Sequence, residues 1–180
     1  MMKKMVFAIS VLAVLLNSTG CKQDAKSVYS YNMDFKEISK WTAMVTPGGG
    51  EGSVTKADNV AIIKAAPDGW GGVQSEKITL DLTKDPILLV QVKESRDGFK
   101  WGVKFVPSTL QIEDHAWGFY LIEDNNFKWN NYAGVDLRAK LGQDVIGLYG
   151  EKIEGVFWIY TTGGPESTVE ITGLKIFNQK

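Results

Sequence analysis

Residues 87–106, ILLVQVKESRDGFKWGVKFV, contain two runs in which every second side chain is large and apolar. These apolar residues are Leu88, Val90 and Val92 in the first run, and Trp101, Val103 and Phe105 in the second. Alternation with a period of two is typical of a strand that buries one face. The intervening Arg96-Asp97-Gly98 has the composition of a turn. The stretch therefore predicts two strands, each with one face toward a hydrophobic core.

Short runs of β-branched and aromatic residues recur along the rest of the chain, with Gly, Pro, Asn or Asp between them. They predict strands at residues 41–46, 60–65, 73–82, 87–94, 100–106, 118–122, 127–132, 156–161 and 169–177. One short helix is predicted at 136–141, with Asp136 as its N-cap and Gly142 as its stop. Eight or nine strands without a β-α-β rhythm favour an all-β fold, an antiparallel β-sandwich or jelly roll.

The N-terminus has the pattern of an export signal. Lys3 and Lys4 precede an apolar run at 5–16, which is too short to cross a bilayer as a helix, since that needs about 20 residues. Ser18-Thr19-Gly20-Cys21 resembles a lipobox, with Ser18 where a branched apolar residue is usual. We therefore expect a signal peptide at 1–20 and acylation of Cys21, with palmitate among the attached chains. The alternative is an ordinary signal peptide and an incidental Cys21.

The remaining chain is expected to form a tether at 21–33 and a single domain at 34–180. Lys22 stands after the cysteine, where an Asp would retain a lipoprotein in the inner membrane. Residues 22–24 also resemble the short charged export tag of Bacteroidetes surface lipoproteins. The expected location is therefore the outer membrane, with the domain lipid-anchored and exposed at the cell surface, where outer-membrane proteins are candidate partners.

Composition excludes several classes of function. The chain has 20 Lys and Arg against 21 Asp and Glu, which is not the basic balance of a nucleic-acid-binding domain. Cys21 is the only cysteine, so no internal disulfide can form. The single histidine, His115, cannot build a multi-histidine zinc site. The chain also has no Gly-x-Ser-x-Gly motif to present a nucleophilic serine.

Five segments, taken in order, resemble the galactose-binding-like jelly roll of carbohydrate-binding-module-type domains. They are Asp34-Phe35 followed by Trp41, the segment 69–73 (GWGGV), the segment 78–82 (ITLDL), the segment 85–88 (DPIL) and the segment 101–104 (WGVK). The resemblance extends to the closing strand at 169–177. It implies a sandwich that binds a sugar chain without cleaving it, often with a structural calcium near the chain ends. Asp34 and Glu37 are the candidate calcium ligands, but Thr172 stands where the family's last strand usually offers a carboxylate.

Six tryptophans suggest where a sugar would bind. Trp41, Trp101 and Trp158 lie inside alternating strands and are expected in the core. The others lie at strand ends or among polar residues, where an indole can stack on the apolar face of a pyranose and nearby amides can bind its hydroxyls. The candidate ligand-binding residues are Trp70, Trp117, Trp129, Asn130, Asn131, Tyr132 and Lys104.

Two other sets of polar residues are candidates for a ligand-binding or catalytic site. Gln91, Lys93 and Lys104 point away from the apolar faces of their strands and form a second candidate ligand face. His115 and the adjacent acids at 113–114 and 123–124 are expected in solvated loops, because neighbouring carboxylates on an extended chain point apart.

Three functions fit the sequence. The first is non-catalytic glycan binding by a membrane-anchored lipoprotein, with a polysaccharide or oligosaccharide as ligand. The second is a jelly-roll glycan-active enzyme, a hydrolase or lyase that uses two carboxylates. The third is a structural or assembly component of an outer-membrane complex, whose tryptophans bury against a protein partner.

Overall fold

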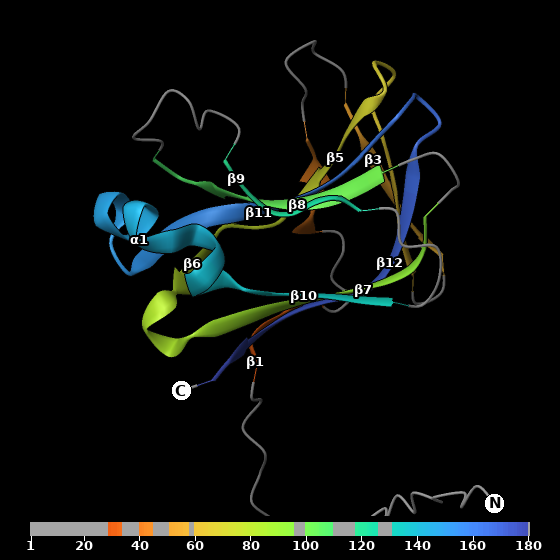
Figure 1. Cartoon of the computed structure of the whole chain (residues 1–180). Coiled ribbons are helices and arrows are strands. Elements are labelled where there is room, and N and C mark those ends of the chain that lie inside the picture. The colour runs from red at the N-terminus through yellow and green to blue at the C-terminus, as the bar shows by residue number, and fades with distance from the viewer. Residues whose placement is uncertain are drawn as a thin grey trace, which may run out of the picture.

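The computed structural model describes residues 29–33, 40–44, 51–57, 60–95, 100–109, 118–125 and 131–179. These residues form twelve strands, one 3-10 helix and one α-helix (Figure 1). The strands are β1 (Tyr29–Met33), β2 (Thr42–Ala43), β3 (Ser53–Ala57), β4 (Val60–Lys64), β5 (Trp70–Gln74), β6 (Ile78–Asp81), β7 (Pro86–Ser95), β8 (Lys100–Pro107), β9 (Phe119–Asn125), β10 (Asn131–Asp136), β11 (Lys152–Thr162) and β12 (Thr168–Asn178). The 3-10 helix η2 (Leu82–Lys84) precedes β7, and α1 (Leu137–Tyr149) precedes β11.

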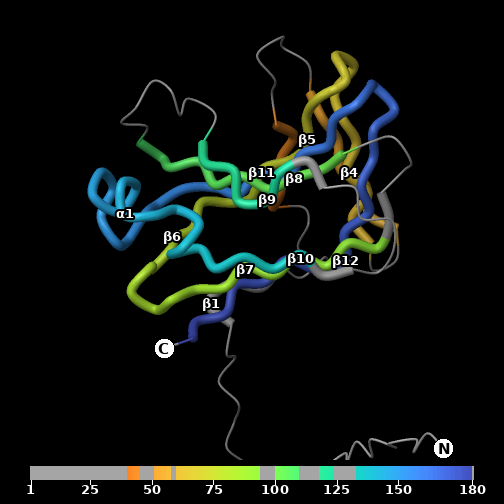
Figure 2. The backbone as a smooth tube through the Cα atoms, in the orientation of Figure 1, coloured from red at the N-terminus to blue at the C-terminus, as the bar shows by residue number. Residues whose placement is uncertain are grey.

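The strands form two antiparallel sheets that lie one above the other (Figures 1 and 2). One sheet has the order β10-β7-β12-β4-β3, with β1 also paired to β12. The other has the order β2-β5-β11-β8-β9, with β6 also paired to β11. We call them the β7 sheet and the β8 sheet. The antiparallel β-sandwich expected from the sequence is confirmed.

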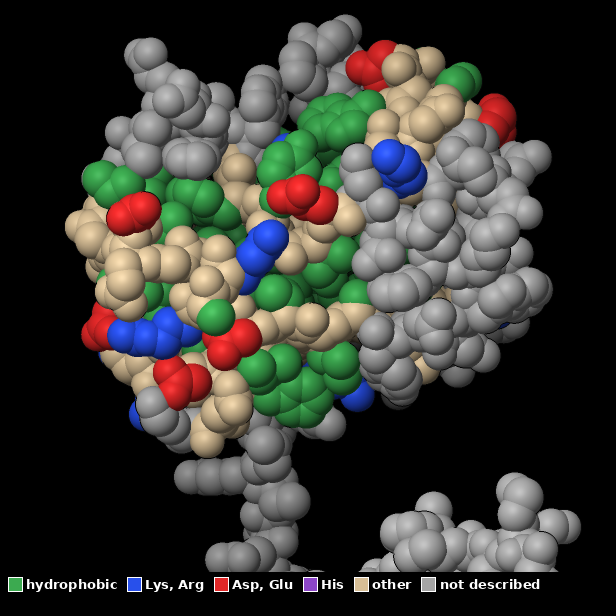
Figure 3. Space-filling view, in the orientation of Figure 1, with side chains coloured by type: hydrophobic (Ala, Val, Ile, Leu, Met, Phe, Trp, Pro, Cys, Tyr) green, Lys and Arg blue, Asp and Glu red, His purple; other side chains and the backbone are tan. Residues whose placement is uncertain are grey.

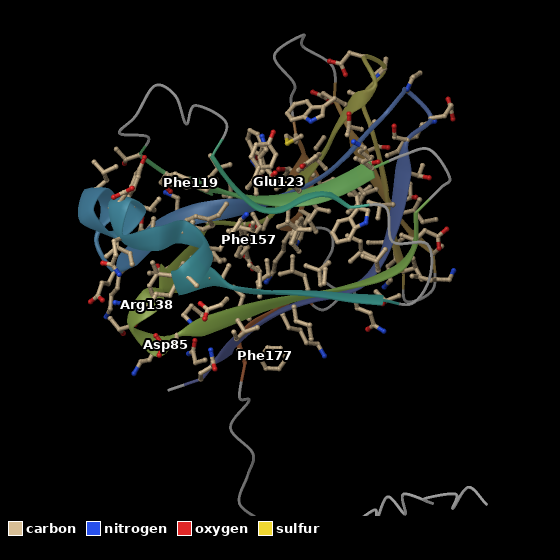
Figure 4. All side chains as sticks on the ribbon, in the orientation of Figure 1. Asp85, Phe119, Glu123, Arg138, Phe157 and Phe177 are labelled. Atoms are coloured by element: carbon tan, nitrogen blue, oxygen red, sulfur yellow. The ribbon has the colours of Figure 1, made fainter. Side chains whose placement is uncertain are left out.

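The core between the sheets is built by the alternation that defines the two central runs. Leu88, Val90 and Val92 of β7 are fully buried, and so are Trp101, Val103 and Phe105 of β8. They belong to one hydrophobic cluster that takes residues from both sheets. Figure 4 shows Phe157 of β11 between the two layers, where its ring meets that of Phe105 at 5.4 Å.

Several strands differ from the sequence prediction. The predicted strand at 73–82 is two strands, β5 and β6, with residues 75–77 between them. β3 was not predicted, because an exposed edge strand such as SVTKA needs no apolar alternation. β1 lies within the segment that we expected to be a tether, and its backbone pairs with β12. Its sequence, YSYNM, alternates Tyr29, Tyr31 and Met33 with Ser30 and Asn32, a period of two that is typical of a strand.

The helix is longer than the predicted 136–141. Asp136 is its N-cap, as expected, with its carboxylate accepting a hydrogen bond from the Ala139 amide at 2.9 Å. Gly142 leaves the helical conformation with φ 75°, but the chain then resumes a helix up to Tyr149. The helix continues because Leu141 and Val145 pack into the core at one end of the sandwich.

Candidate functional site

The outward face of the β8 sheet carries a row of polar and aromatic residues in register. Gln74 of β5 pairs with Trp158 of β11, Trp158 pairs with Lys104 of β8, and Lys104 pairs with Tyr120 of β9. Residues paired across a sheet project to the same side. Because Phe157 and Ile159 point into the core, Trp158 points outward, and so does its whole row.

Tyr160, two residues after Trp158 on β11, lies on the same outward face. Its two partners across the sheet are both glycines, Gly72 of β5 and Gly102 of β8. A Cβ on Gly102 would collide with the Tyr160 hydroxyl and would lie 2.5 Å from its ring carbon Cζ. The phenol ring therefore lies over Gly102, in the space that a side chain would otherwise fill.

Two further rings flank Tyr160. Trp70 of β5 lies 6.3 Å from it between ring centroids, tilted by 40°, and Tyr120 lies 6.1 Å from it at 78°, edge to face. The Lys104 ammonium lies 3.9 Å from the centroid of Tyr120 and 5.7 Å from those of Trp70 and Tyr160. We call this set, Trp70, Lys104, Tyr120, Trp158 and Tyr160, the aromatic face.

The members of the aromatic face differ in exposure. Tyr120 is 42% exposed and Trp70 is half-buried, whereas Tyr160 and Lys104 are almost fully buried. Trp158 is also buried, and its indole N–H donates to Gln74 Oε1 at 3.2 Å. Trp70 and Tyr120 are thus the two rings of this set that a ligand can reach. Figure 3 shows hydrophobic side chains on the upper part of the molecule, next to acidic and basic ones.

Two of the sequence candidates, Trp70 and Lys104, come together in the aromatic face. Of the tryptophans expected in the core, Trp41 and Trp101 belong to the main core cluster. Trp158 is buried as well, but in a second cluster with Met44 and Tyr160 on the outward side of the β8 sheet. Alternation along β11 gives Trp158 this direction, since Phe157 and Ile159 occupy the inward positions.

The second candidate face, made of Gln91, Lys93 and Lys104, does not exist as one surface. Gln91 and Lys93 lie on β7 and Lys104 lies on β8, so they belong to different sheets. The outward sides of two packed sheets face opposite directions, and Lys93 instead pairs with Glu170 at 2.9 Å on its own sheet. The sequence shows which side of a strand is polar, but not which sheet the strand joins.

The other sequence candidates are only partly placed. Asn131 and Tyr132 belong to β10, in the β7 sheet and not in the sheet of Trp70; the placement of their side chains lies outside what the structure describes. The remaining candidates fall outside the described residues: Cys21, Asp34, Glu37, His115, Trp117, Trp129 and Asn130. Within the described ranges, no three Asp, Glu, His or Cys side chains come together as a metal site, and no helix is long and apolar enough to cross a membrane.

Tyr120, Tyr160 and Gln74 lie at this site but are not among the residues predicted from the sequence. The sequence does contain a pattern that predicts the direction of Tyr160. Trp158 and Tyr160 alternate with Phe157 and Ile159, so these two pairs lie on opposite faces of the strand. The glycines opposite Tyr160 could not be assigned from the chain, because they become its neighbours only through the pairing of β5, β11 and β8.

Two pockets are formed by described residues away from the aromatic face. One, of about 230 Å³, is lined by residues of β6, η2, β7 and β12, including Asp81, Lys84 and Asn178. The other, of about 200 Å³, lies beside Tyr149, Lys152 and Glu154. Each of these two pockets contains one carboxylate among its lining residues.

No protein-family model matches the chain, and no curated protein sequence matches it either. Among solved structures, the chain is similar to PfGH50B, with 8% identity and a TM-score of 0.47 over 78% of this chain and 22% of that one. It is also similar to the globular domain of T. cruzi calreticulin, with 12% identity and a TM-score of 0.48 over 84% of this chain and 88% of that one. The chain thus spans about a fifth of PfGH50B, and both likenesses are partial.

Proposed function

We propose that the protein binds carbohydrate on the aromatic face and does not cleave it. The observation that carries the proposal is the pair of accessible rings, Trp70 and Tyr120, which stand on either side of the buried Tyr160. The apolar C–H face of a pyranose stacks on such rings. Two platforms on one sheet suit successive sugar units of a chain better than a single small ligand.

Polar groups beside these rings support a sugar more than a purely apolar partner. Gln74, Thr162 and Thr42 lie on the same outward face, because each is paired in register with a residue of that face. Amides and hydroxyls both donate and accept hydrogen bonds, as sugar hydroxyls require. The centre of a protein–protein interface is depleted of charged residues, whereas this face has Lys104 at its centre.

The non-catalytic part of the proposal rests on the chemistry of glycoside hydrolysis. That reaction usually uses two carboxylates about 5–9 Å apart on either side of the scissile bond. On the outward face described above, Glu123 follows Tyr120 on β9 and is exposed, and Figure 4 labels it at the β8 sheet. Among the described residues, the exposed Asp68 also lies beside Trp70, whose backbone amide donates a hydrogen bond to its Oδ1 at 3.4 Å. The proposal of binding without cleavage therefore rests on the two accessible rings.

We propose in addition that the domain is a lipoprotein held at the outer membrane through Cys21. The support is the sequence pattern of residues 3–21, in which a basic start, an apolar run at 5–16 and the segment Ser18-Thr19-Gly20 precede the only cysteine. A lipid anchor would keep a glycan-binding face at the membrane where polysaccharides are captured.

The test of glycan binding compares substitutions in the aromatic face with a substitution of an equally exposed hydrophobic residue elsewhere. A glycan array on the full-length chain identifies a ligand, and titration calorimetry then measures Trp70→Ala and Tyr120→Ala. Each should lose about 1–3 kcal/mol of affinity, by analogy with base stacking on aromatic rings. The control is Leu148→Ala on α1, because Leu148 is 41% exposed against 42% for Tyr120.

The expected result is that Leu148→Ala binds like the wild type while the two ring variants do not. Thermal melts of Tyr120→Ala and Leu148→Ala should stay close to the wild type, because removing an exposed side chain leaves no cavity. Trp70→Ala should melt somewhat earlier, because Trp70 is half-buried and packs against the cluster of Trp158 and Tyr160. Unchanged affinity in both ring variants would reject the aromatic face as the binding site.

A further inference from the structure

The buried lysine of the aromatic face shows what kind of sugar the site takes. Lys104 is 2% exposed, which is unusual for a side chain that is almost always at the surface or paired. Alternation along β8 turns it away from the core, since its neighbours Val103 and Phe105 are the inward residues. Its ammonium therefore lies within the aromatic face.

The contacts of this ammonium are aromatic. It lies 3.9 Å from the centroid of the Tyr120 ring and 5.7 Å from those of Trp70 and Tyr160. Ring faces attract a cation electrostatically. They do not replace the three hydrogen-bond acceptors that a lysine ammonium can use. Burial of most of the side chain limits the water that can reach this ammonium, so an anionic partner would add hydrogen bonds that the rings do not provide.

Other lysines of the described residues have carboxylate partners. Lys64 pairs with Glu166 at 3.0 Å, Lys93 pairs with Glu170 at 2.9 Å, and Lys152 lies 3.7 Å from Asp81. All three lysines are much more exposed than Lys104. Between described residues, no carboxylate lies within ion-pair distance of the Lys104 ammonium. Lys104 differs from these three lysines in being buried and in having aromatic rings, not a carboxylate, as its described neighbours.

We infer that the aromatic face binds an acidic glycan, whose carboxylate or sulfate accepts hydrogen bonds from Lys104. This inference rests on the proposed function and adds the charge of the ligand to it. The sugar ring stacks on Trp70 or Tyr120, and its anionic substituent points into the space between the rings. Tyr120, whose ring lies 3.9 Å from the ammonium, is exposed and belongs to β9, the last strand of the β8 sheet, so the ammonium lies next to a ring that a ligand can reach.

The experiment uses three pairs of polysaccharides that differ in charge. They are polygalacturonate and its methyl ester, hyaluronan and its carboxyl-reduced form, and dextran sulfate and dextran. Binding of the full-length chain is measured by titration calorimetry. The charged member of at least one pair should bind about tenfold tighter or more, as expected for hydrogen bonds to a charged group. The pair that responds distinguishes a carboxylate ligand from a sulfate ligand.

Variants assign the preference to one cation. Lys104→Met keeps most of the length of the unbranched side chain and removes the charge, so it should lower affinity for the charged polysaccharide to that of its neutral partner. Lys104→Arg should retain the preference. Lys93→Met on the opposite sheet is the matched control and should behave like the wild type. Glu123→Gln should not weaken binding of the charged member, because it removes a negative charge from the same face.

The failures of the two proposals are distinguishable. Equal binding of charged and neutral members by the wild type overturns the acidic-glycan inference and leaves glycan binding in place; this comparison needs no variant. A charge preference that survives in a folded Lys104→Met assigns it to another cation and also overturns the inference. Absence of binding to these polysaccharides and to every glycan of the array rejects the proposed function together with the inference.

Discussion

Trp101 and Lys104 stand three residues apart on β8 and face opposite sides of its sheet. Trp101 fills the core and is fully buried, while Lys104 enters the aromatic face. An odd spacing along a strand reverses the direction of the side chain. Stability and binding therefore depend on different residues of one strand, and single substitutions should separate them.

Replacing Trp101 with alanine tests the core side of β8. The change should lower the free energy of unfolding by about 3–5 kcal/mol, because it removes a fully buried indole. Urea unfolding followed by far-UV circular dichroism measures it. Tyr120→Ala, which truncates an exposed ring of the neighbouring strand, is the comparison and should unfold close to the wild type. Equal midpoints for Trp101→Ala and the wild type would place Trp101 outside the core.

Replacing Gly102 with alanine tests the packing of Tyr160. The new Cβ would lie 2.5 Å from the Ile122 carbonyl oxygen and would collide with the Tyr160 ring. The expected cost is about 1–3 kcal/mol, as for other overpacked sites, with a weakened glycan affinity as the aromatic face shifts. Gly147→Ala in α1 is the control, since no atom lies within 4 Å of its added Cβ. A neutral Gly102→Ala would mean that Tyr160 does not lie over this glycine.

At the scale of elements, the segment that links β6 to β7 is held by one carboxylate. Asp81 caps η2, accepting hydrogen bonds from the Thr83 hydroxyl at 2.6 Å and the Thr83 amide at 3.1 Å. Arg138 of α1 donates to the Leu82 carbonyl at 2.9 Å and to Glu151 at 2.8 Å, which connects this turn to the helix and to β11. Figure 4 shows Asp85 and Arg138 at this end of the sandwich. The turn thus joins strands of both sheets.

The Asp81 cap should give stability a dependence on acid pH. The hydrogen bond from the Thr83 side chain lowers the pKa of Asp81, with Lys152 and Lys84 adding smaller effects in the same direction. A lowered pKa in the folded state stabilises the protein above the unfolded pKa of about 3.9, and this contribution disappears as the pH falls through the folded value. Asp81→Asn should therefore be less stable than the wild type at pH 7, with the gap closing below about pH 4.

Urea midpoints at several pH values between neutral and strongly acidic conditions measure this gap. Thr83→Val, which removes the principal hydrogen-bond donor, should reduce the same pH dependence while leaving the carboxylate in place. A constant gap between Asp81→Asn and the wild type at all pH values would show that the cap acts through shape alone.

For the whole molecule, β8 and β11 carry both the core and the aromatic face. Their inward residues pack the two sheets together, and their outward residues Lys104, Trp158 and Tyr160 lie buried between the accessible rings of Trp70 on β5 and Tyr120 on β9. Figure 1 shows the two strands side by side in the β8 sheet. The outward side of the β7 sheet instead carries the Lys93–Glu170 ion pair. The sandwich is therefore two-sided, and we expect the glycan on the β8 sheet alone.

Replacing Cys21 with alanine tests the proposed attachment to the membrane. Metabolic labelling with a fatty acid should mark the wild type and not the variant, because the thiol is the site of acylation. The variant should also either be absent from the membrane fraction or keep its signal peptide, because the lipoprotein peptidase cuts only before an acylated cysteine. Cells that express Lys22→Asp provide a second comparison, in which the label persists but the protein is retained in the inner membrane. Label in Cys21→Ala would reject the lipobox assignment.

The sequence by itself determined the fold class and much of the core. Alternation in β7 and β8 predicted which of their side chains are buried, and Asp136 predicted the start of the helix. Such features depend on neighbours along the chain, because strand direction and helix capping repeat within a few residues. Trp70 could be chosen for the same reason, since three glycines around it leave little side-chain surface to bury it.

Only the tertiary structure decided which residues meet Trp70. Its neighbours lie far from it along the chain, at 34 positions for Lys104, 50 for Tyr120 and 90 for Tyr160. They come together because the strands that carry them pair in the order β5-β11-β8-β9. That order also separates Lys104 from Gln91 and Lys93, which the sequence grouped together. Local patterns give the direction of a side chain relative to its own strand. The sheet that a strand joins, and therefore the surface its side chains share, depends on long-range pairing that short sequence patterns do not encode.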